Sequence, residues 1–232
     1  MPFHLRPSAP TAPLALLCGD PARALAIAQR VLTQPRMSNH HRGLWGYFGE
    51  TSSGLEMTVQ STGIGGPSAA IVLGELADLG LRAAIRIGTC SALDGTLPLG
   101  TGVVVGSALA CDGTSAALGS SAGAVVEPDD ALTRWLSAVV PGAPVRVISR
   151  DVPPDPLPFR FEAGAVGQAE VADLQSAPLL VATRRLGIAA AVMLAVGASG
   201  GRRLEDEPLE ARLLKLAEIG AEALEASGSA RD

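Results

Sequence analysis

Short apolar runs alternate with stretches of helical periodicity along most of this chain. Residues 14–18 are continuously apolar, which is typical of a short buried strand, and Pro21 then suits the first turn of a helix over residues 22–31. The same alternation continues towards the C-terminus. It predicts a hairpin of residues 45–50 and 55–60, strands at 83–87, 103–109, 145–148 and 190–196, and helices at 67–79, 132–139, 174–186 and 207–226.

This alternation predicts an α/β fold with three layers (α/β/α), in which helices cover both faces of a central mixed sheet. The 232 residues are enough for a large core, so we expect a single domain over residues 1–232. Ligands in such folds bind beyond the carboxyl ends of the strands. Three motifs of this chain fall at such positions.

The three motifs combine glycine and other small residues with arginine. They are Gly19-Asp20-Pro21-Ala22-Arg23, the glycine-rich stretch 61–68, and Arg86-Ile87-Gly88-Thr89. Each is expected to end a strand in a loop. If these loops converge at one edge of the sheet, they offer backbone N–H groups, a hydroxyl and two guanidinium groups to an anion the size of phosphate.

Each motif also has an interpretation that needs no ligand. Asp20 suits the N-cap of the helix that follows it, and the stretch 61–68 suits a tight turn between a strand and a helix. That stretch lacks the third spaced glycine of a dinucleotide-binding fold and the lysine of a P-loop. Arg86 is costly to bury alone, so it either binds an anion or pairs with a buried carboxylate such as Glu75.

Composition narrows the class of protein. Apolar residues make up 47% and charged residues 18%, which is typical of a globular chain, and the net charge of −5 disfavours a general nucleic-acid grip. The longest apolar stretch, residues 188–196, is too short to cross a membrane, and prolines interrupt the first 13 residues. We therefore expect a cytoplasmic enzyme or binding protein with no nucleic-acid or membrane partner.

Cysteine and lysine usage adds two further points. Cys18, Cys90 and Cys111 are widely spaced and form no Cys-x-x-Cys motif, which indicates neither a disulfide framework nor a zinc site. Lys215 is the only lysine, so nearly all basic residues are arginine. Arginine is better suited to bidentate contacts with oxyanions, although the same bias is expected from genomic composition.

The three motifs, in this order and at this spacing, resemble the nucleoside phosphorylase family, and its uridine phosphorylases most closely. The resemblance runs from Phe3-His4-Leu5 to about Asp112 and returns at residues 173–187. It implies the phosphorylase/hydrolase-like form of the α/β/α fold and a pentosyltransferase activity. In that reaction inorganic phosphate is the co-substrate. It cleaves the N-glycosidic bond of a nucleoside to a free base and a pentose 1-phosphate, without a metal or another cofactor.

The resemblance also implies which residues form the site. Phosphate would be bound by Gly19, Arg23, Arg42, Arg86 and Thr89, the ribose by His4, Leu174 and Gln175, and the base by Cys90, Ser91 and Asp151. Arg86 and Gln175 would be the catalytic residues. In the family, the residues that match His4 and Arg42 reach into the site of a neighbouring subunit, so a homodimer or homohexamer is expected.

Three segments depart from the family. Asp173-Leu174-Gln175-Ser176 lies where the family has Glu-Met-Glu-Ser, whose second glutamate holds the ribose hydroxyls. Gln175 can still hydrogen-bond but lacks the charge, so we expect Gln175→Glu to raise turnover about tenfold. The segment 149–161, around Val152, lacks the glutamine–arginine pair that reads uracil, and residues 196–199 lack the aspartate of purine-specific members.

These departures leave three interpretations open. The first is a nucleoside phosphorylase. The second is a phosphorylase-like binding protein with impaired catalysis, which the change at Gln175 favours. The third is a nucleosidase, or an enzyme of a specialised pathway that acts on a modified nucleoside, with Arg150 or Asp151 serving a different base.

Overall fold

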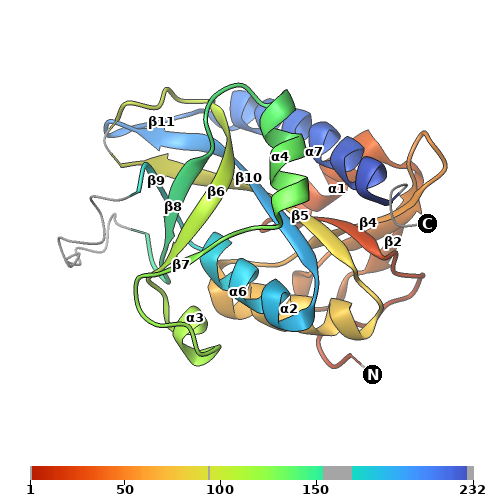
Figure 1. Cartoon of the computed structure of the whole chain (residues 1–232). Coiled ribbons are helices and arrows are strands. Elements are labelled where there is room, and N and C mark those ends of the chain that lie inside the picture. The colour runs from red at the N-terminus through yellow and green to blue at the C-terminus, as the bar shows by residue number, and fades with distance from the viewer. Residues whose placement is uncertain (1, 94, 154–168, 229–232) are drawn as a thin grey trace.

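The computed structural model describes residues 2–93, 95–153 and 169–228, and its strands belong to one mixed sheet (Figure 1). The strands are β1 (Leu14–Cys18), β2 (Thr33–Asn39), β3 (Gly46–Glu50), β4 (Glu56–Ser61), β5 (Ala83–Ala92), β6 (Gly102–Ala110), β7 (Ala124–Val126), β8 (Val145–Ser149), β9 (Val171–Asp173), β10 (Ala189–Ser199) and β11 (Arg202–Arg203). The helices are α1 (Pro21–Val31), α2 (Gly65–Asp78), α3 (Gly113–Ala117), α4 (Asp130–Val139), α6 (Ser176–Leu186), α7 (Asp206–Gly228) and the short 3-10 helix η1 (His41–Gly43).

The sheet is partly closed on itself. Its strands follow the order β11-β10-β6-β8-β9-β5-β1-β4-β3-β2, with β7 paired to β6. Because β10 also pairs with β5, the strands β5, β10, β6, β8 and β9 form a ring, from which β1, β4, β3 and β2 extend as an open sheet. The pairs β1–β4, β1–β5 and β5–β10 are parallel, so the carboxyl ends of these strands point the same way.

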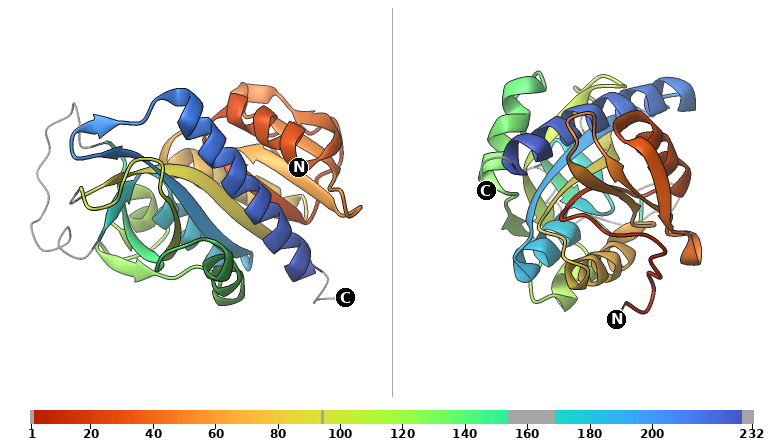
Figure 2. Two further views of the ribbon diagram at one scale, coloured as in Figure 1. Left: turned by 90° about the horizontal axis from the view of Figure 1, so that it is seen from above. Right: turned by 90° about the vertical axis from the view of Figure 1, so that its right-hand side faces the viewer.

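Helices cover both faces of the sheet (Figures 1 and 2). α7 packs against α1 and α4 on one face, and α2, α3 and α6 pack together on the other. Each face buries its own apolar cluster, with Ile27, Leu136 and Leu213 in the first and Leu73 and Leu179 in the second. The three-layer α/β architecture predicted from the sequence is confirmed.

Local chemistry explains where α1 begins. The Asp20 carboxylate accepts a hydrogen bond of 2.8 Å from the backbone N–H of Arg23, as an N-cap does, and Pro21 occupies the first turn. Ala24, Ile27 and Ala28 then form the buried face of the helix. The capping role expected for Asp20 is therefore confirmed, and it fixes the helix position of Arg23 close to the end of β1.

The sequence prediction was wrong about the end of β5. The apolar pattern stops at Ile87 and predicted a turn at Gly88-Thr89, but β5 continues to Ala92. Pairing that is distant in sequence extends it: β10 runs beside β5 up to Ser91, and β9 adds to its last residues. Gly88 and Thr89 therefore lie within a strand and not in a loop.

Other differences follow from side-chain exposure and from caps. β2 was not predicted because it contains Pro35 and most of its side chains are exposed. The helix expected from residue 174 begins at Ser176, because the Asp173 carboxylate accepts hydrogen bonds from its N–H and hydroxyl. No helix in the described ranges is both long and apolar enough to span a membrane.

Candidate functional site

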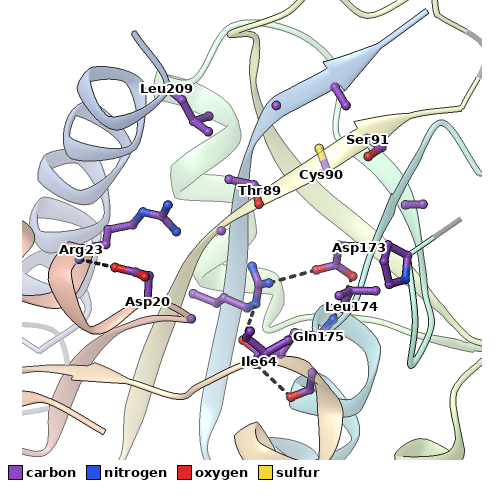
Figure 3. A pocket seen from close by; sticks show the side chains of 18 of the residues that line it. Asp20, Arg23, Ile64, Thr89, Cys90, Ser91, Asp173, Leu174, Gln175 and Leu209 are labelled. Atoms are coloured by element: carbon purple, nitrogen blue, oxygen red, sulfur yellow. Dashed lines mark hydrogen bonds and ion pairs between the residues drawn. The ribbon is translucent and has the colours of Figure 1, made fainter. Parts of the chain in front are cut away.

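A cavity of about 610 Å³ opens at the carboxyl ends of β1 and β5 (Figure 3). Its walls come from the β1–α1 loop, the turn between β4 and α2, the second half of β5, the start of α6, and the segment from β10 to α7. The site residues from the sequence analysis that line it are Gly19, Arg23, Arg86, Thr89, Cys90, Ser91, Leu174 and Gln175. The fold therefore brings the three motifs together, the first after β1, the second after β4 and the third along β5.

Arg86 is a buried cation of this cavity, with a side chain that is 7% exposed. Its Nη2 atom lies 3.2 Å from the Asp173 carboxylate, and its Nε atom donates to Gln175 Oε1 at 3.2 Å. Nη1 is buried and has no hydrogen-bond partner among the described residues. A buried guanidinium N–H without a partner is costly, so this atom is the natural contact for an anion that enters the cavity.

Gly88 is what allows Arg86 to lie in this way. A Cβ atom at position 88 would stand 1.6 Å from Nη1 and 2.5 Å from Cζ of Arg86. The guanidinium therefore occupies the space where any larger residue would place its side chain. Burial lowers the pKa of Arg86 from its usual value, and the nearby Asp173 charge opposes that fall.

Asp173 was not among the predicted site residues, and the structure places it at the centre of the buried network. Its carboxylate, 1% exposed, accepts from the Ser149 hydroxyl at 2.6 Å and the Ser176 hydroxyl at 2.7 Å, in addition to its pairing with Arg86. Its only signal in the sequence was its place in the motif Asp173-Leu174-Gln175-Ser176, which the family resemblance singles out. These contacts hold Asp173 fixed in the wall of the cavity.

Gln175 has every hydrogen-bonding position of its amide in use. Oε1 lies 3.0 Å from the Thr62 hydroxyl and accepts from Arg86 Nε, while Nε2 donates to the carbonyl oxygens of Gly63 and Gly65, each at 3.0 Å. Gly63 and Gly65 both have positive φ angles, so this turn needs glycine and an external donor to hold its shape. In this structure the amide fixes the turn and has no position left for a sugar hydroxyl.

Arg23 lines the cavity from α1, and its guanidinium is already paired. Nη2 lies 2.7 Å and Nε 3.2 Å from Oε1 of Glu210 on α7. Burial lowers the pKa of Arg23 and the Glu210 carboxylate raises it, with a net rise. Glu210 was not predicted as part of the site, and a sequence separation of 187 residues offered no signal for it.

Burial disfavours the thiolate form of two cysteines near the cavity. Burial raises the pKa of Cys90, which lines the cavity, far above its usual value, and it raises that of Cys18 to about 12. Both therefore stay protonated at neutral pH. Ser91 lies beside Cys90 near the end of β5 and also lines the cavity (Figure 3).

Three predicted site residues lie outside this cavity. The Asp151 carboxylate accepts from the backbone N–H of Gly113 at 2.8 Å at the start of α3, whereas its neighbours Arg150 and Val152 line the cavity. Arg42 is exposed on η1 with a φ angle of 58°. The His4 ring contacts Glu75 on α2, with Nδ1 2.7 Å from Oε1. Part of the predicted base-binding segment, residues 154–161, lies outside the described residues.

Glu75 anchors the N-terminal segment instead of pairing with Arg86. Its carboxylate accepts from the backbone N–H groups of Phe3, His4 and Leu5 at 2.6–3.0 Å. Burial tends to raise the pKa of Glu75, but these donors and the His4 ring lower it to about 2. The alternative partner proposed for Arg86 from the sequence was therefore wrong, and Asp173 fills that role.

The Phosphorylase superfamily profile matches residues 13–230. The chain is 44% identical over 79 residues to a DeoD-type purine nucleoside phosphorylase of Oceanobacillus iheyensis, covering 34% of this chain and 33% of that protein. It is 39% identical over 104 residues to the uridine phosphorylase of Haemophilus influenzae, covering 45% and 40% respectively. These alignments thus span about a third to two-fifths of each relative's length.

Solved structures show the same fold over nearly the whole chain. A uridine phosphorylase from Vibrio fischeri matches with a TM-score of 0.78, 22% identity, and coverage of 94% of this chain and 92% of that one. A purine nucleoside phosphorylase from Toxoplasma gondii in complex with immucillin-H matches with a TM-score of 0.81, 22% identity, and coverage of 95% and 92%. At this identity the likeness concerns the fold alone.

Proposed function

This chain belongs to the phosphorylase superfamily, and on that premise we propose that it cleaves a nucleoside by phosphorolysis to a free base and a pentose 1-phosphate. The observation that carries the proposal is the buried, unpartnered Nη1 of Arg86 among the described residues of the cavity. Purine nucleoside and uridine phosphorylases among the similar proteins support the same reaction class. Inorganic phosphate would be the co-substrate.

The residues that line the cavity include two arginines and several small residues that phosphate can contact. Arg86 would donate from Nη1, Arg23 from the edge that Glu210 leaves free, and Thr89 from its hydroxyl, with Gly19 close to the same wall. Each of these lines the cavity from β5, α1 or the β1–α1 loop. Arginine suits these contacts, because its planar guanidinium matches the geometry of a phosphate group.

Held there, phosphate would act as nucleophile and as counter-ion. As the C–N bond breaks, the base leaves with the electron pair and takes up a proton, and positive charge develops on the sugar ring. The bound dianion stabilises this oxocarbenium-like state and then forms the new C–O bond. Arg86 contacts the reacting phosphate in this scheme, and Gln175 acts through Arg86 by fixing its Nε side.

We extend the proposal to a shared site in a homodimer or a ring of dimers. Arg42 is exposed outside the cavity, which suits a residue that binds phosphate in a neighbouring subunit. Glu75 holds Nδ1 of His4 and leaves Nε2 for a contact elsewhere, such as a ribose hydroxyl of the neighbour's substrate. Both roles rest on the family resemblance of the N-terminal half.

A phosphate-binding protein without turnover is the second candidate. The observation that favours it is the Gln175 amide, whose four positions are used within the protein where the family has a ribose-binding glutamate. Such a protein would bind phosphate as tightly as the enzyme does. Cleavage of any nucleoside in the presence of phosphate excludes this candidate.

Calorimetric titration of Arg86 variants with phosphate tests the proposed site. Arg86→Ala should weaken phosphate binding by about 10- to 100-fold, because hydrogen bonds to charged groups contribute about 1.5–3 kcal/mol each. Since this variant leaves Asp173 buried without its cation, Arg86→Lys is measured beside it: it keeps a charge for Asp173 but loses the planar fork.

The matched control is Arg82→Ala, which removes an exposed arginine just before β5 that does not line the cavity. It should bind phosphate as the wild type does. Melting curves confirm that each variant is folded. Folded Arg86→Lys and Arg86→Ala proteins with unchanged phosphate affinity would refute the assignment of the site.

A further inference from the structure

The pair of Arg23 and Glu210 joins the cavity to the C-terminal helix. α1 packs along α7, and the Arg23 guanidinium meets the Glu210 carboxylate side-on, with Nη2 2.7 Å and Nε 3.2 Å from Oε1 and Nε 3.3 Å from Oε2. The Arg23 side chain is 15% exposed and that of Glu210 is 41% exposed. Arg23 lines the cavity, whereas Glu210 does not.

We propose that Glu210 is a positioning residue for the anion site: it fixes the Arg23 guanidinium so that its unpaired end faces the entering phosphate. The inference rests on the proposed function, because it assigns the ligand of Arg23 as phosphate. A guanidinium has five N–H donors, and the side-on pair occupies the Nε–H and one Nη2–H. The two hydrogens of Nη1 and the second of Nη2 remain, and they form the edge that suits bidentate contact with an oxyanion.

Entropy explains why the contact with Glu210 strengthens phosphate binding by Arg23. A free arginine side chain loses rotamer entropy when it is held on a ligand. Glu210 fixes Arg23 before any ligand arrives, so that cost no longer opposes phosphate binding. The Glu210 carboxylate also raises the pKa of Arg23, against the lowering effect of its partial burial.

Competition is the opposite interpretation of the same contact. If Glu210 occupied the phosphate position itself, phosphate would have to expel it, and removing the carboxylate would tighten binding. The placement of the two side chains argues against this, because Asp206 and Leu209 of α7 line the cavity while Glu210 lies outside its lining. The two interpretations predict opposite signs for one substitution.

The same two helices supply a matched control. About two turns further along each helix, Arg30 of α1 pairs through Nε with Glu218 of α7. Neither residue lines the cavity. Glu218, which also pairs with Lys215, is the matching carboxylate, and Glu218→Gln removes it from the same helix pair without touching the site. Any effect that arises from loosening α1 against α7 should appear in both substitutions, and an effect on positioning should appear only at Glu210.

The experiment is phosphate titration by calorimetry for the wild type, Glu210→Gln, Glu218→Gln, Arg23→Ala and the double variant Arg23→Ala/Glu210→Gln. We expect Glu210→Gln to weaken phosphate binding roughly five- to tenfold and Glu218→Gln to leave it unchanged. In the Arg23→Ala background, Glu210→Gln should have no further effect, since Glu210 acts through Arg23. In turnover, the KM for phosphate should rise while kcat and the KM for the nucleoside stay close to wild type.

Three results would overturn the inference. Tighter phosphate binding by Glu210→Gln would show competition, unchanged binding would show that the pair is irrelevant to the site, and equal losses in Glu210→Gln and Glu218→Gln would show a general effect of helix packing. A wild-type protein that binds no phosphate would overturn the proposed function, and the positioning role with it. Wild-type binding that Arg23→Ala weakens and Glu210→Gln does not would overturn the positioning role alone.

Discussion

Replacing Gln175 with glutamate tests whether the buried amide is a lost catalytic group or a working structural one. In the structure, Nε2 donates to the carbonyls of Gly63 and Gly65. A carboxylate at this position has no hydrogen to donate and turns a second oxygen towards both carbonyls. The contacts with the Thr62 hydroxyl and with Arg86 Nε would remain, and they would gain strength from the charge.

The balance of these effects is destabilising. Two buried carbonyl groups that each lose a donor cost about 1–3 kcal/mol apiece, and the stronger charged contacts offset about 1–2 kcal/mol. We therefore expect Gln175→Glu to lower the free energy of unfolding by about 2–4 kcal/mol. For a chain of this size the melting temperature should fall by about 5–15 °C.

The stability loss caused by Gln175→Glu should depend on pH in a definite direction. Burial beside Asp173 should raise the pKa of the introduced carboxyl, and the protonated form can donate one hydrogen bond. An acid with a raised pKa in the folded state costs stability as pH rises through that pKa, so the deficit relative to wild type should be larger at pH 8 than at pH 5.5. The measurement is differential scanning calorimetry of both proteins across this range.

Gln60→Glu is the matched control. Gln60 is also a buried amide that donates to backbone carbonyls, among them those of Leu44 and Ser61, but it does not line the cavity. The Gln60→Glu variant should lose stability and keep its phosphate affinity. The Gln175→Glu variant should lose stability and also bind phosphate more weakly, because a further carboxylate beside Arg86 repels the anion. A Gln175→Glu protein that melts like wild type and turns over faster would refute this reasoning and support the tenfold gain expected from the sequence.

Two further predictions concern Arg86 and Arg42. Gly88→Ala should weaken phosphate binding about tenfold or more in a titration, because the new Cβ occupies the place of the Arg86 guanidinium. The control Gly74→Ala, whose Cβ meets nothing within 4 Å in α2, should bind phosphate as the wild type does. Equal phosphate affinities of the two variants would contradict this geometry. Inactive Arg42→Ala and Arg86→Ala proteins, mixed and allowed to exchange subunits, should recover about a quarter of wild-type activity if the site is shared, and none if it is not.

The sequence predicted which motifs meet but not how their side chains are arranged. Gly19, Arg23 and Arg86 come together because strand order places the carboxyl ends of β1 and β5 side by side, and the apolar runs revealed both strands. The continuation of β5 through Gly88 depends on pairing with β10 and β9, which local pattern does not encode. Arg86 therefore lies over a strand glycine where a turn was expected.

Buried polar networks were the least predictable feature. Gln175 was interpreted from a single position in a motif, yet its role is set by Thr62, Gly63 and Gly65, more than a hundred residues away, and by Arg86. Glu210 pairs with Arg23 only because α7 returns along α1. Such contacts have no periodicity, so they become visible only when the fold is known.

The most direct test of the account is to follow the fate of phosphate with a panel of nucleosides: uridine, thymidine, inosine and adenosine. Wild-type protein in phosphate buffer should convert at least one of them, and phosphorus NMR should show a pentose 1-phosphate in the same amount as the free base. Without phosphate no base should be released. Release of base and free pentose at a rate independent of phosphate, or no conversion of any nucleoside, would contradict phosphorolysis.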